Sequence, residues 1–407
     1  MAKINFEKFN KPEVEYSLCE KIRNKIQLRT RLRKIYDIFL GSLYGYVNGV
    51  STSKAAFEEQ LIFPEDKFVM PEMKDVFGQT HKNFHAYEAT IPPFYVRSFK
   101  NAFCFTNREE IFSLERSVVL EYTSQKNNPF IGVNRKIFHS KHVKKLDASV
   151  ALLSLSGLEN NYGHWLMECL GRYYLLEKSK FKPDYYVISN HKPFQKQFID
   201  LLGIENNRII PSSENTLIQA RELIVPSLLN NWEYVDYRGY RFYQKQYLPA
   251  WIGNLYKEKV LPKIKKTAPQ KIYISRKLAS SRKIENEDEI TAYLVKRGFK
   301  VYCLETMTVQ EQLELFANAS IVVGPHGAGF ANMIFSPRNT IIFELFPEFY
   351  HDAGLRIPAK TLGLNYFYMV GKTRNIENVH PQKENIYINL NLFIEALNII
   401  FLDKEVQ

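Results

Sequence analysis

The feature that most constrains the fold is a regular alternation of short apolar runs with helical patterns. Residues 150–155 (VALLSL) predict a strand, 163–178 a helix, 185–189 a strand and 194–202 a helix. A second series repeats the alternation from residue 271 to residue 345, with strands expected at 271–275, 300–304, 320–323 and 340–345. Alternation of this kind predicts parallel sheets with crossover helices, so the expected fold class is α/β.

The two series predict two domains, and 407 residues are enough to build both. A stretch rich in Lys and Pro, residues 257–271, separates them and is typical of a connection. We expect a mostly helical and irregular N-terminal extension over 1–85, a first α/β domain over 86–256 and a second over 257–407. The closing helix, expected at 388–401, could pack back on the first domain.

The composition is that of a soluble globular protein, with 45% hydrophobic and 24% charged residues. The net charge of +12 suits nucleic acid, an anionic membrane or a phosphorylated substrate as a partner. Zinc-ligand spacing, helix-turn-helix and RNA-binding patterns are missing from the sequence, which argues against nucleic acid. Residues 21–34 interleave basic and apolar side chains at helical spacing, which fits either peripheral membrane contact or a solvated helix packed on the main body.

Targeting signals are also missing from the sequence. The longest apolar runs are too short to span a bilayer, and residues 1–10 lack the pattern of a signal peptide. The four cysteines form no C-x-x-C pair, which suits free thiols in a reducing compartment. The expectation is a cytoplasmic protein, with possible contact at the inner face of the membrane through 21–34.

The segment 324–329 (GPHGAG) follows four apolar residues of an expected strand. A buried strand that ends in a glycine turn and opens a helix directs several backbone N–H groups at an anion. Gly327, Ala328 and Gly329 would let a phosphate approach the backbone, and His326 could donate a hydrogen bond to it. The spacing is neither that of the dinucleotide fingerprint nor that of a P-loop. A tight structural turn is the alternative interpretation.

Basic and acidic residues lie at the ends of two expected strands of the second series. Ser275 and Arg276 lie at the carboxyl end of the first strand of the second series, Arg282 lies in the next loop, and Glu344 lies near the carboxyl end of the strand 340–345. Ligands of open α/β sheets bind outside the carboxyl ends of the strands. The two arginines there could hold a diphosphate, and Glu344 could accept hydrogen bonds from ribose hydroxyls. The alternatives are a solvated loop for the arginines and a buried ion pair for Glu344.

Together these motifs resemble glycosyltransferase family 61, which includes plant xylan-decorating transferases, animal O-GlcNAc-type transferases and bacterial capsular polysaccharide proteins. The matching segments are 161–168 (NYGHWLME), 273–277 (YISRK), 281–287 (SRKIENE), 311–317 (EQLELFA) and 322–335 (VVGPHGAGFANMIF), followed by Glu344. Residues 1–85 are not covered by the resemblance.

The resemblance implies a GT-B architecture, in which two Rossmann-like domains face a cleft and the second holds a nucleotide-sugar donor. It implies inversion at the anomeric carbon, no metal or other cofactor, a UDP-sugar as donor, and a glycan or glycolipid acceptor in capsular or surface polysaccharide synthesis. The metal-gripping Asp-x-Asp of other glycosyltransferases is missing from the sequence, in agreement. The implied donor-binding residues are Ser275, Arg276, Arg282, His326, Gly327, Ala328, Gly329, Asn332 and Glu344. A catalytically inactive carbohydrate-binding protein of the same fold and a basic nucleic-acid-binding protein are the alternatives.

An inverting transfer needs one general base for the acceptor hydroxyl. His164 and Glu168 lie four residues apart, so on a helix they share a face. The family places an acid four residues after the histidine, more often Asp than the Glu found here. We expect Glu168 to be the base with His164 orienting it. His164 as the base is the competing assignment, because histidine titrates near neutral pH. A surface ion pair is a third interpretation.

Overall fold

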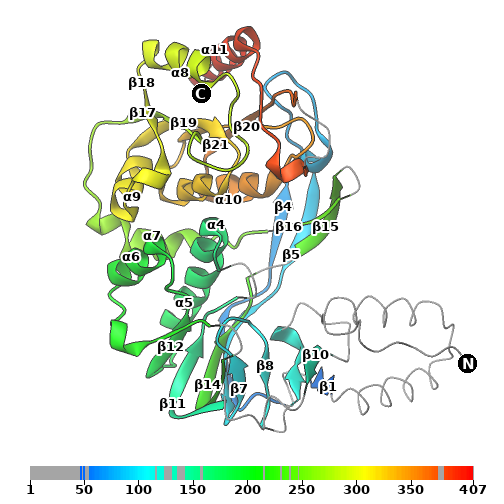
Figure 1. Cartoon of the computed structure of the whole chain (residues 1–407), viewed down its shortest axis with the longest axis vertical. Coiled ribbons are helices and arrows are strands. Elements are labelled where there is room, and N and C mark those ends of the chain that lie inside the picture. The colour runs from blue at the N-terminus through cyan, green and yellow to red at the C-terminus, as the bar shows by residue number, and fades with distance from the viewer. Residues whose placement is uncertain are drawn as a thin grey trace, which may run out of the picture.

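The computed structural model describes residues 46–47, 49–50, 55–114, 117–122, 131–134, 143–155, 159–213, 216–229, 232–237, 240–245, 247–374 and 380–406. The basic segment 21–34 lies outside this range. The described chain forms two α/β halves stacked along the long axis, with a layer of helices between their sheets (Figure 1). The predicted α/β class is confirmed.

The first half is built on a mixed sheet whose strands run in the order β13-β12-β11-β14-β7-β8-β9-β2. The strands β13, β12, β11 and β14 are parallel, β7 and β6 pair with β14 in antiparallel fashion, and β3 adds to β6. The strands of this sheet are β2 Gly49–Val50, β3 Glu58–Phe63, β6 Phe94–Lys100, β7 Phe103–Phe105, β8 Ile111–Phe112, β9 Val118–Val119, β11 Val143–Leu152, β12 Tyr185–Ile188, β13 Ile209–Pro211 and β14 Leu217–Pro226. The helices of this half are α4 Tyr162–His164, α5 Leu170–Glu177, α6 Pro193–Leu202 and α7 Ile252–Lys259.

The second half is a wholly parallel sheet in the order β18-β17-β19-β20-β21. The strand order reverses between β17 and β19, so the loops that leave their carboxyl ends diverge there and leave room for a ligand. The elements of this half are β17 Gln270–Ile274, α8 Glu287–Lys296, β18 Phe299–Tyr302, α9 Val309–Ala317, β19 Ala319–Pro325, the 3-10 helix η9 Ala328–Phe335, β20 Ile341–Phe346, α10 Arg356–Leu362, β21 Asn365–Val370 and α11 Leu390–Val406. Shorter paired strands are β1 Tyr46–Val47 with β10 Ile131–Asn134, β4 Asp66–Met70 with β5 Tyr87–Ile91, and β15 Trp232–Tyr237 with β16 Tyr240–Lys245.

Both faces of the second sheet are buried, as its near-continuous apolar strands require. Ile272 and Ile274 face the helices between the halves, whereas Tyr273 between them faces the outer layer of α8 and α11. Phe393 of α11 stacks on Phe343 of β20 at a ring distance of 5.9 Å. The closing helix therefore packs on its own sheet and not on the first half, because its apolar face matches the outer face of that sheet.

One hydrophobic core joins the halves. Trp165 and Leu166 of the first half belong to the same buried cluster as Ile272, Val322 and Phe346 of the second. The predicted boundary at residue 257 falls within α7, whose Tyr256 donates its hydroxyl to the carbonyl oxygen of Leu166. The division into domains stays a prediction.

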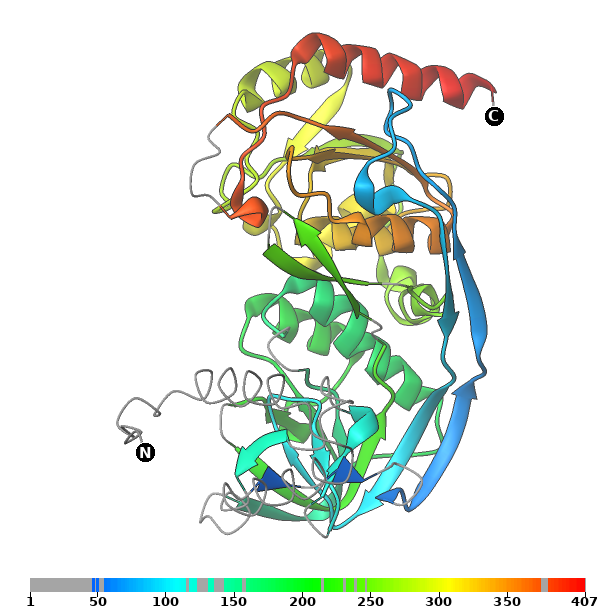
Figure 2. The same cartoon turned by 90° about the vertical axis from the view of Figure 1, so that its right-hand side faces the viewer.

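The described part of the predicted N-terminal extension consists of short strands and irregular segments with one 3-10 helix, Lys82–Phe84, so these residues do not confirm its mostly helical character; the rest of 1–85 lies outside the described residues. Phe68 and Met70 are buried and Val69 between them is exposed, which is the period of two of a strand. The strands β3, β4 and β5 run along one side of the molecule from the first sheet to the second half (Figure 2). The segment between β4 and β5 packs on the second half, where Phe84 stacks on Tyr368 at 3.9 Å.

Within the described residues, no helix is both long and apolar enough to cross a membrane.

Candidate active site

The loops after β17 and β19 meet at the switch point of the second sheet. The guanidinium of Arg276 lies directly over Gly327, since a Cβ placed on Gly327 would overlap its Nη1 atom. Nε and Nη2 of Arg276 donate to the carbonyl oxygen of Ser281 at 3.2 and 3.0 Å, which fixes the guanidinium there. Burial and the neighbouring Arg282 lower the pKa of Arg276 to about 10, so the side chain remains charged at neutral pH.

Arg282 is the second cation of this loop pair. Its backbone has a φ of 54°, a left-handed conformation that side-chain-bearing residues rarely adopt. The side chain donates Nε to the carbonyl oxygen of His326 at 3.0 Å and Nη1 to that of Gln382 at 2.5 Å. These bonds hold a strained residue in place and set a second positive charge close to Arg276. Burial lowers the pKa of Arg282, as it does for Arg276.

The helix predicted after the glycine turn is present as the 3-10 helix η9. Phe330 N–H donates to the carbonyl oxygen of Gly327 at 3.0 Å, and the N–H of His326 continues the sheet by donating to Leu345 at 2.9 Å. The N–H groups of Ala328 and Gly329, in the first turn of η9, have no acceptor within the helix, and both residues are half-buried. These are the loop N–H groups that an anion could use.

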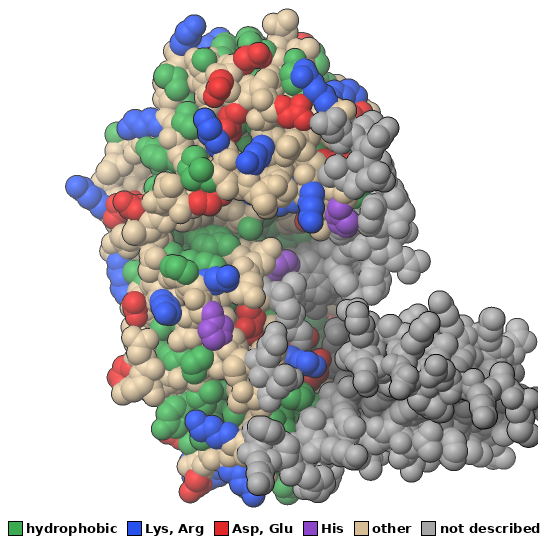
Figure 3. Space-filling view, viewed as in Figure 1, with side chains coloured by type: hydrophobic (Ala, Val, Ile, Leu, Met, Phe, Trp, Pro, Cys, Tyr) green, Lys and Arg blue, Asp and Glu red, His purple; other side chains and the backbone are tan. Residues whose placement is uncertain are grey.

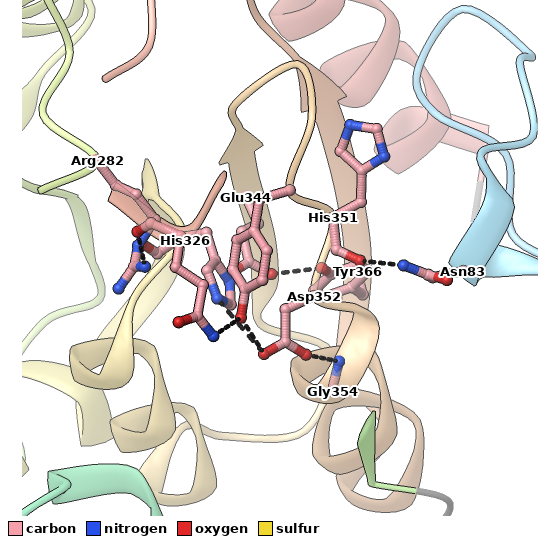
Figure 4. Close-up of polar contacts among 10 residues, drawn as sticks. Asn83, Arg282, His326, Glu344, His351, Asp352, Gly354 and Tyr366 are labelled. Carbon is pink, nitrogen blue, oxygen red and sulfur yellow. Dashed lines mark hydrogen bonds and ion pairs between the residues drawn. The ribbon is translucent and has the colours of Figure 1, made fainter. Parts of the chain in front are cut away.

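His326 and Glu344 form a buried pair beside Arg282 (Figure 4). Nδ1 of His326 lies 2.6 Å from Oε1 of Glu344, and the hydroxyl of Tyr366 donates to the other carboxylate oxygen. Burial raises the pKa of Glu344 to about 8. Burial, reinforced by Arg282 and Arg276, lowers the pKa of His326 to about 3. Both shifts favour the uncharged form of each partner in this water-poor setting.

Three predicted donor-binding residues have other partners. Glu344 is fully buried with both oxygens engaged, so the alternative of a buried pair fits and the ribose contact does not. Ser275 donates its hydroxyl to Glu287 at 2.9 Å and so anchors the loop to the first turn of α8. Asn332 is also fully buried, with its side-chain amide engaged by Tyr162 and by Gln312. These side chains shape the site without facing its opening.

The first half contributes the His164–Glu168 pair. Asn161 caps α4, where its Oδ1 accepts from the N–H groups of Gly163 and His164 at 3.0 and 3.3 Å. The chain then forms a π-helical turn, Trp165–Cys169, of the kind often found at functional sites. Nδ1 of His164 lies 2.8 Å from Oε1 of Glu168, as the four-residue spacing predicted. The His164 side chain is 26% exposed and that of Glu168 is 1% exposed, so the imidazole is the accessible member.

The two groups of residues meet because α4 packs directly on η9. A Cβ on Gly163 would lie 3.4 Å from Cβ of Ala331, which is ordinary contact distance. Tyr162 donates its hydroxyl to Oδ1 of Asn332 at 2.5 Å, so a partly buried hydrogen bond crosses the junction. On the face shown in Figure 3 the molecule is hollowed between the halves, with hydrophobic side chains at the floor.

Two residues of the site were missed by the sequence reasoning. Asp352 lies in the loop after β20, with Oδ2 3.9 Å from Nε2 of His326 and 3.0 Å from the hydroxyl of Tyr350. Tyr350 in turn lies beneath Arg282, whose guanidinium carbon is 5.8 Å from the ring centre. Their position in the sequence was the only signal available, because the loop after β20 leaves the same edge of the sheet as the loops after β17 and β19. Among the described residues, no three His, Cys, Asp or Glu side chains gather in a way that could hold a metal ion.

The site therefore defines an α/β protein with two arginines beside a glycine turn at a topological switch point, and with a His–Glu pair next to that turn. Residues 162–343 match the family model described as Glycosyltransferase 61, so the resemblance drawn from the motifs is confirmed over this stretch.

Curated relatives agree with the family. The chain is 28% identical over 191 residues to an alpha-1,3-arabinosyltransferase of Oryza sativa subsp. japonica, covering 43% of this chain and 31% of that protein. It is 25% identical over 260 residues to a beta-1,2-xylosyltransferase of the same plant, covering 57% and 44%. It is 32% identical over 119 residues to the EGF domain-specific O-linked N-acetylglucosamine transferase of Drosophila melanogaster, covering 28% and 21%. The chain thus spans less than half the length of each of these relatives.

Proposed function

We propose that this protein is a glycosyltransferase that moves a sugar from a nucleotide-diphosphate donor to a hydroxyl group of a glycan acceptor. The observation that carries the proposal is the packing of α4 on η9. It brings the accessible His164, with Glu168 behind it, beside a turn flanked by two arginines within a glycosyltransferase 61 domain. A base and a cationic leaving-group site are the two parts that direct sugar transfer requires.

The donor-binding part consists of Arg276, Arg282 and the N–H groups of Ala328 and Gly329. The diphosphate, with UDP as the expected carrier, would lie beside the Arg276 guanidinium, which the missing side chain of Gly327 allows to lie against the backbone of the turn. Desolvated guanidinium groups stabilise the charge that develops as the glycosidic C–O bond breaks, a role that a metal ion has in other transferases. The proposed reaction is accordingly independent of metal.

The base assignment follows from accessibility. We assign His164 as the base, and Glu168 as the carboxylate that orients its ring, because Glu168 is almost wholly buried. This reverses the order of preference drawn from the sequence. In the reaction the acceptor oxygen attacks the anomeric carbon and its proton passes to Nε2 of His164. The bond to the diphosphate breaks on the opposite face, so that the configuration inverts.

The wider setting belongs to the same proposal. The two α/β halves, joined at the helices between them, are compatible with a GT-B arrangement in which the first half offers the acceptor site. A cytoplasmic enzyme of capsular or surface polysaccharide synthesis, touching the membrane through 21–34, accounts for the basic charge of the chain.

A panel of sugar nucleotides tests the proposal. UDP-, GDP-, CMP- and dTDP-sugars are first screened for thermal stabilisation, since a ligand that binds only the folded state raises its melting temperature. Each stabilising donor is then incubated with a mixture of glycan acceptors, with and without EDTA, and new glycosidic products are sought by mass spectrometry. Product formation that resists EDTA is expected. Stabilisation without any product would favour the inactive carbohydrate-binding alternative, and product lost in EDTA would overturn metal independence.

A further inference from the structure

The loop that follows β20 places a carboxylate near Arg282. Asp352 has a side chain that is 34% exposed, whereas its neighbour Glu344 is fully buried. Its Oδ2 lies 3.0 Å from the Tyr350 hydroxyl, and the Tyr350 ring is the one beneath Arg282. A partly open carboxylate therefore stands one aromatic ring away from a guanidinium of the proposed diphosphate site (Figure 4).

The position of Asp352 is fixed from three directions. Its Oδ1 accepts the N–H of Gly354 at 2.9 Å, and Nε2 of His326 faces its Oδ2 at 3.9 Å. The backbone just before it is held by Asn83, whose Nδ2 donates to the carbonyl oxygen of His351 at 2.8 Å. Asn83 comes from the segment between β4 and β5, so the N-terminal strands brace the loop of the second half. A carboxylate fixed in this way is preorganised for a ligand.

A carboxylate in such a position recognises hydroxyl groups. An ionised Asp accepts several hydrogen bonds on two oxygens, and the bonds to Tyr350 and Gly354 leave lone pairs toward solvent. In a nucleotide sugar the diphosphate is flanked by two polyols, the ribose on one side and the transferred sugar on the other. Either one lies next to a diphosphate bound at Arg282.

We propose that Asp352 is a specificity-determining residue that binds a vicinal diol of the donor, the role that the sequence had suggested for Glu344. This inference rests on the proposed function, because it needs a nucleotide diphosphate at Arg276 and Arg282. The rival explanation is that Asp352 only caps the turn 353–355 through Gly354.

Substitutions that keep the cap separate the two explanations. Asn and Ser are as good as Asp at an N-terminal cap, so Asp352→Asn and Asp352→Ser should fold and melt like the wild type. Asp288→Asn, an exposed carboxylate in the first turn of α8, is the matched control. Calorimetry measures binding of UDP, GDP, their 2′-deoxy forms and the corresponding UDP-glucose and GDP-mannose to each variant.

If the diol belongs to ribose, wild type and Asp288→Asn prefer the ribonucleotide over its deoxy form, and both Asp352 variants lose that preference along with about tenfold or more in affinity. If it belongs to the transferred sugar, the ribose preference survives and the variants lose the additional affinity for the sugar nucleotide. Both outcomes support the proposal. Unchanged affinities in Asp352→Asn and Asp352→Ser would overturn it and leave the proposed function standing, whereas no binding of any of these ligands to the wild type would overturn it together with UDP and GDP as carriers.

Discussion

The hydroxyl of Tyr162 donates a 2.5 Å hydrogen bond to Oδ1 of Asn332, and this bond links the two halves of the site. Tyr162 opens α4, two residues before His164, and Asn332 lies in η9, three residues after Gly329. Asn332 also donates to Gln312 of α9 at 2.9 Å, so its amide is held on both sides. The distance between His164, the proposed base, and the glycine turn of the proposed donor site thus depends on this hydrogen bond and on the packing of α4 against η9.

Tyr162→Phe should lower the free energy of unfolding by about 1–3 kcal/mol, because the buried amide oxygen of Asn332 would lose its donor. Urea denaturation measures the change. Tyr185→Phe is the control, since Tyr185 is exposed and its loss of a hydroxyl should change stability by less than about 0.5 kcal/mol. Equal effects in the two variants would show that the Tyr162 bond adds nothing to the junction.

His164→Ala should lower kcat by about 100-fold or more, with the affinity for UDP unchanged, because the base is lost and the donor site is not. Glu168→Gln should lower kcat less, since an amide still accepts a hydrogen bond from Nδ1 of His164 but carries no charge. Glu177→Gln, in α5 of the same helical stretch, is the control and should be fully active. Greater loss in Glu168→Gln than in His164→Ala would return the role of base to Glu168.

Much of the second half was predictable from the sequence. Its strands are apolar on both faces and its helices are bounded by local signals, such as the capping box of Thr308 and Glu311 at the start of α9. The His164–Glu168 contact was predictable for the same reason, because it depends on spacing along one helical stretch. The approach of Arg276 and Arg282 to the glycine turn followed from the rule that ligand-binding loops share one sheet edge.

The remaining features depend on residues distant in sequence. Whether Glu344 faces solvent is decided by His326 and by Tyr366, 22 residues further on, which cover it. The strands of the N-terminal segment carry a weak alternation and pair with partners far along the chain, as Phe63 does with Phe94. Local sequence propensity predicts neither the side chains that cover Glu344 nor the pairing of strands that are far apart in the sequence.

The His326–Glu344 pair predicts an unusual dependence of stability on pH. The folded pKa of Glu344 is raised to about 8, so its contribution is full below its unfolded value near 4.5 and is lost as pH rises toward 8. The folded pKa of His326 is depressed to about 3, so its contribution is full above 6.5 and is lost as pH falls toward 3. Between 4.5 and 6.5 the two slopes oppose each other and cancel.

Urea denaturation from pH 3 to 8.5 measures the free energy of unfolding. The contribution of the His326–Glu344 pair to this free energy should be constant between pH 4.5 and 6.5. Stability should fall on either side, by at most about 1.4 kcal/mol per pH unit for each proton. Glu344→Gln keeps an acceptor for Tyr366 but does not titrate, so the decline from pH 6.5 to 8 should disappear in that variant. If Glu344→Gln shows the same loss of stability from pH 6.5 to 8, that loss comes from other titrating groups.

Arg276→Ala should weaken UDP binding by about 10- to 100-fold, because a charged, bidentate donor to the diphosphate is removed. Arg276→Lys should recover only part of the loss, since an ammonium lacks the planar fork. Lys277→Ala removes an equal charge from the adjacent exposed position and serves as the control. Calorimetry measures the UDP affinity of the wild type and the three variants. If Arg276→Ala and Lys277→Ala lose the same affinity, positive charge near the loop matters and the position of Arg276 over Gly327 does not.

Two glycines of the turn should respond differently to the same methyl group. A Cβ on Gly324 would lie 2.6 Å from the backbone oxygen of Ile274 in the neighbouring strand, which cannot move without parting β17 from β19. Gly324→Ala should therefore lower the free energy of unfolding by about 1–3 kcal/mol, the usual cost of overpacking.

A Cβ on Gly327 would meet the end of the flexible Arg276 side chain, which can swing aside. Since Gly327 has an extended backbone, Gly327→Ala should unfold like the wild type but bind UDP as weakly as Arg276→Ala. The double variant Gly327→Ala with Arg276→Ala should then bind no more weakly than either single variant, because the methyl group acts by displacing the guanidinium. Additive losses would instead mean that the methyl group itself obstructs the diphosphate.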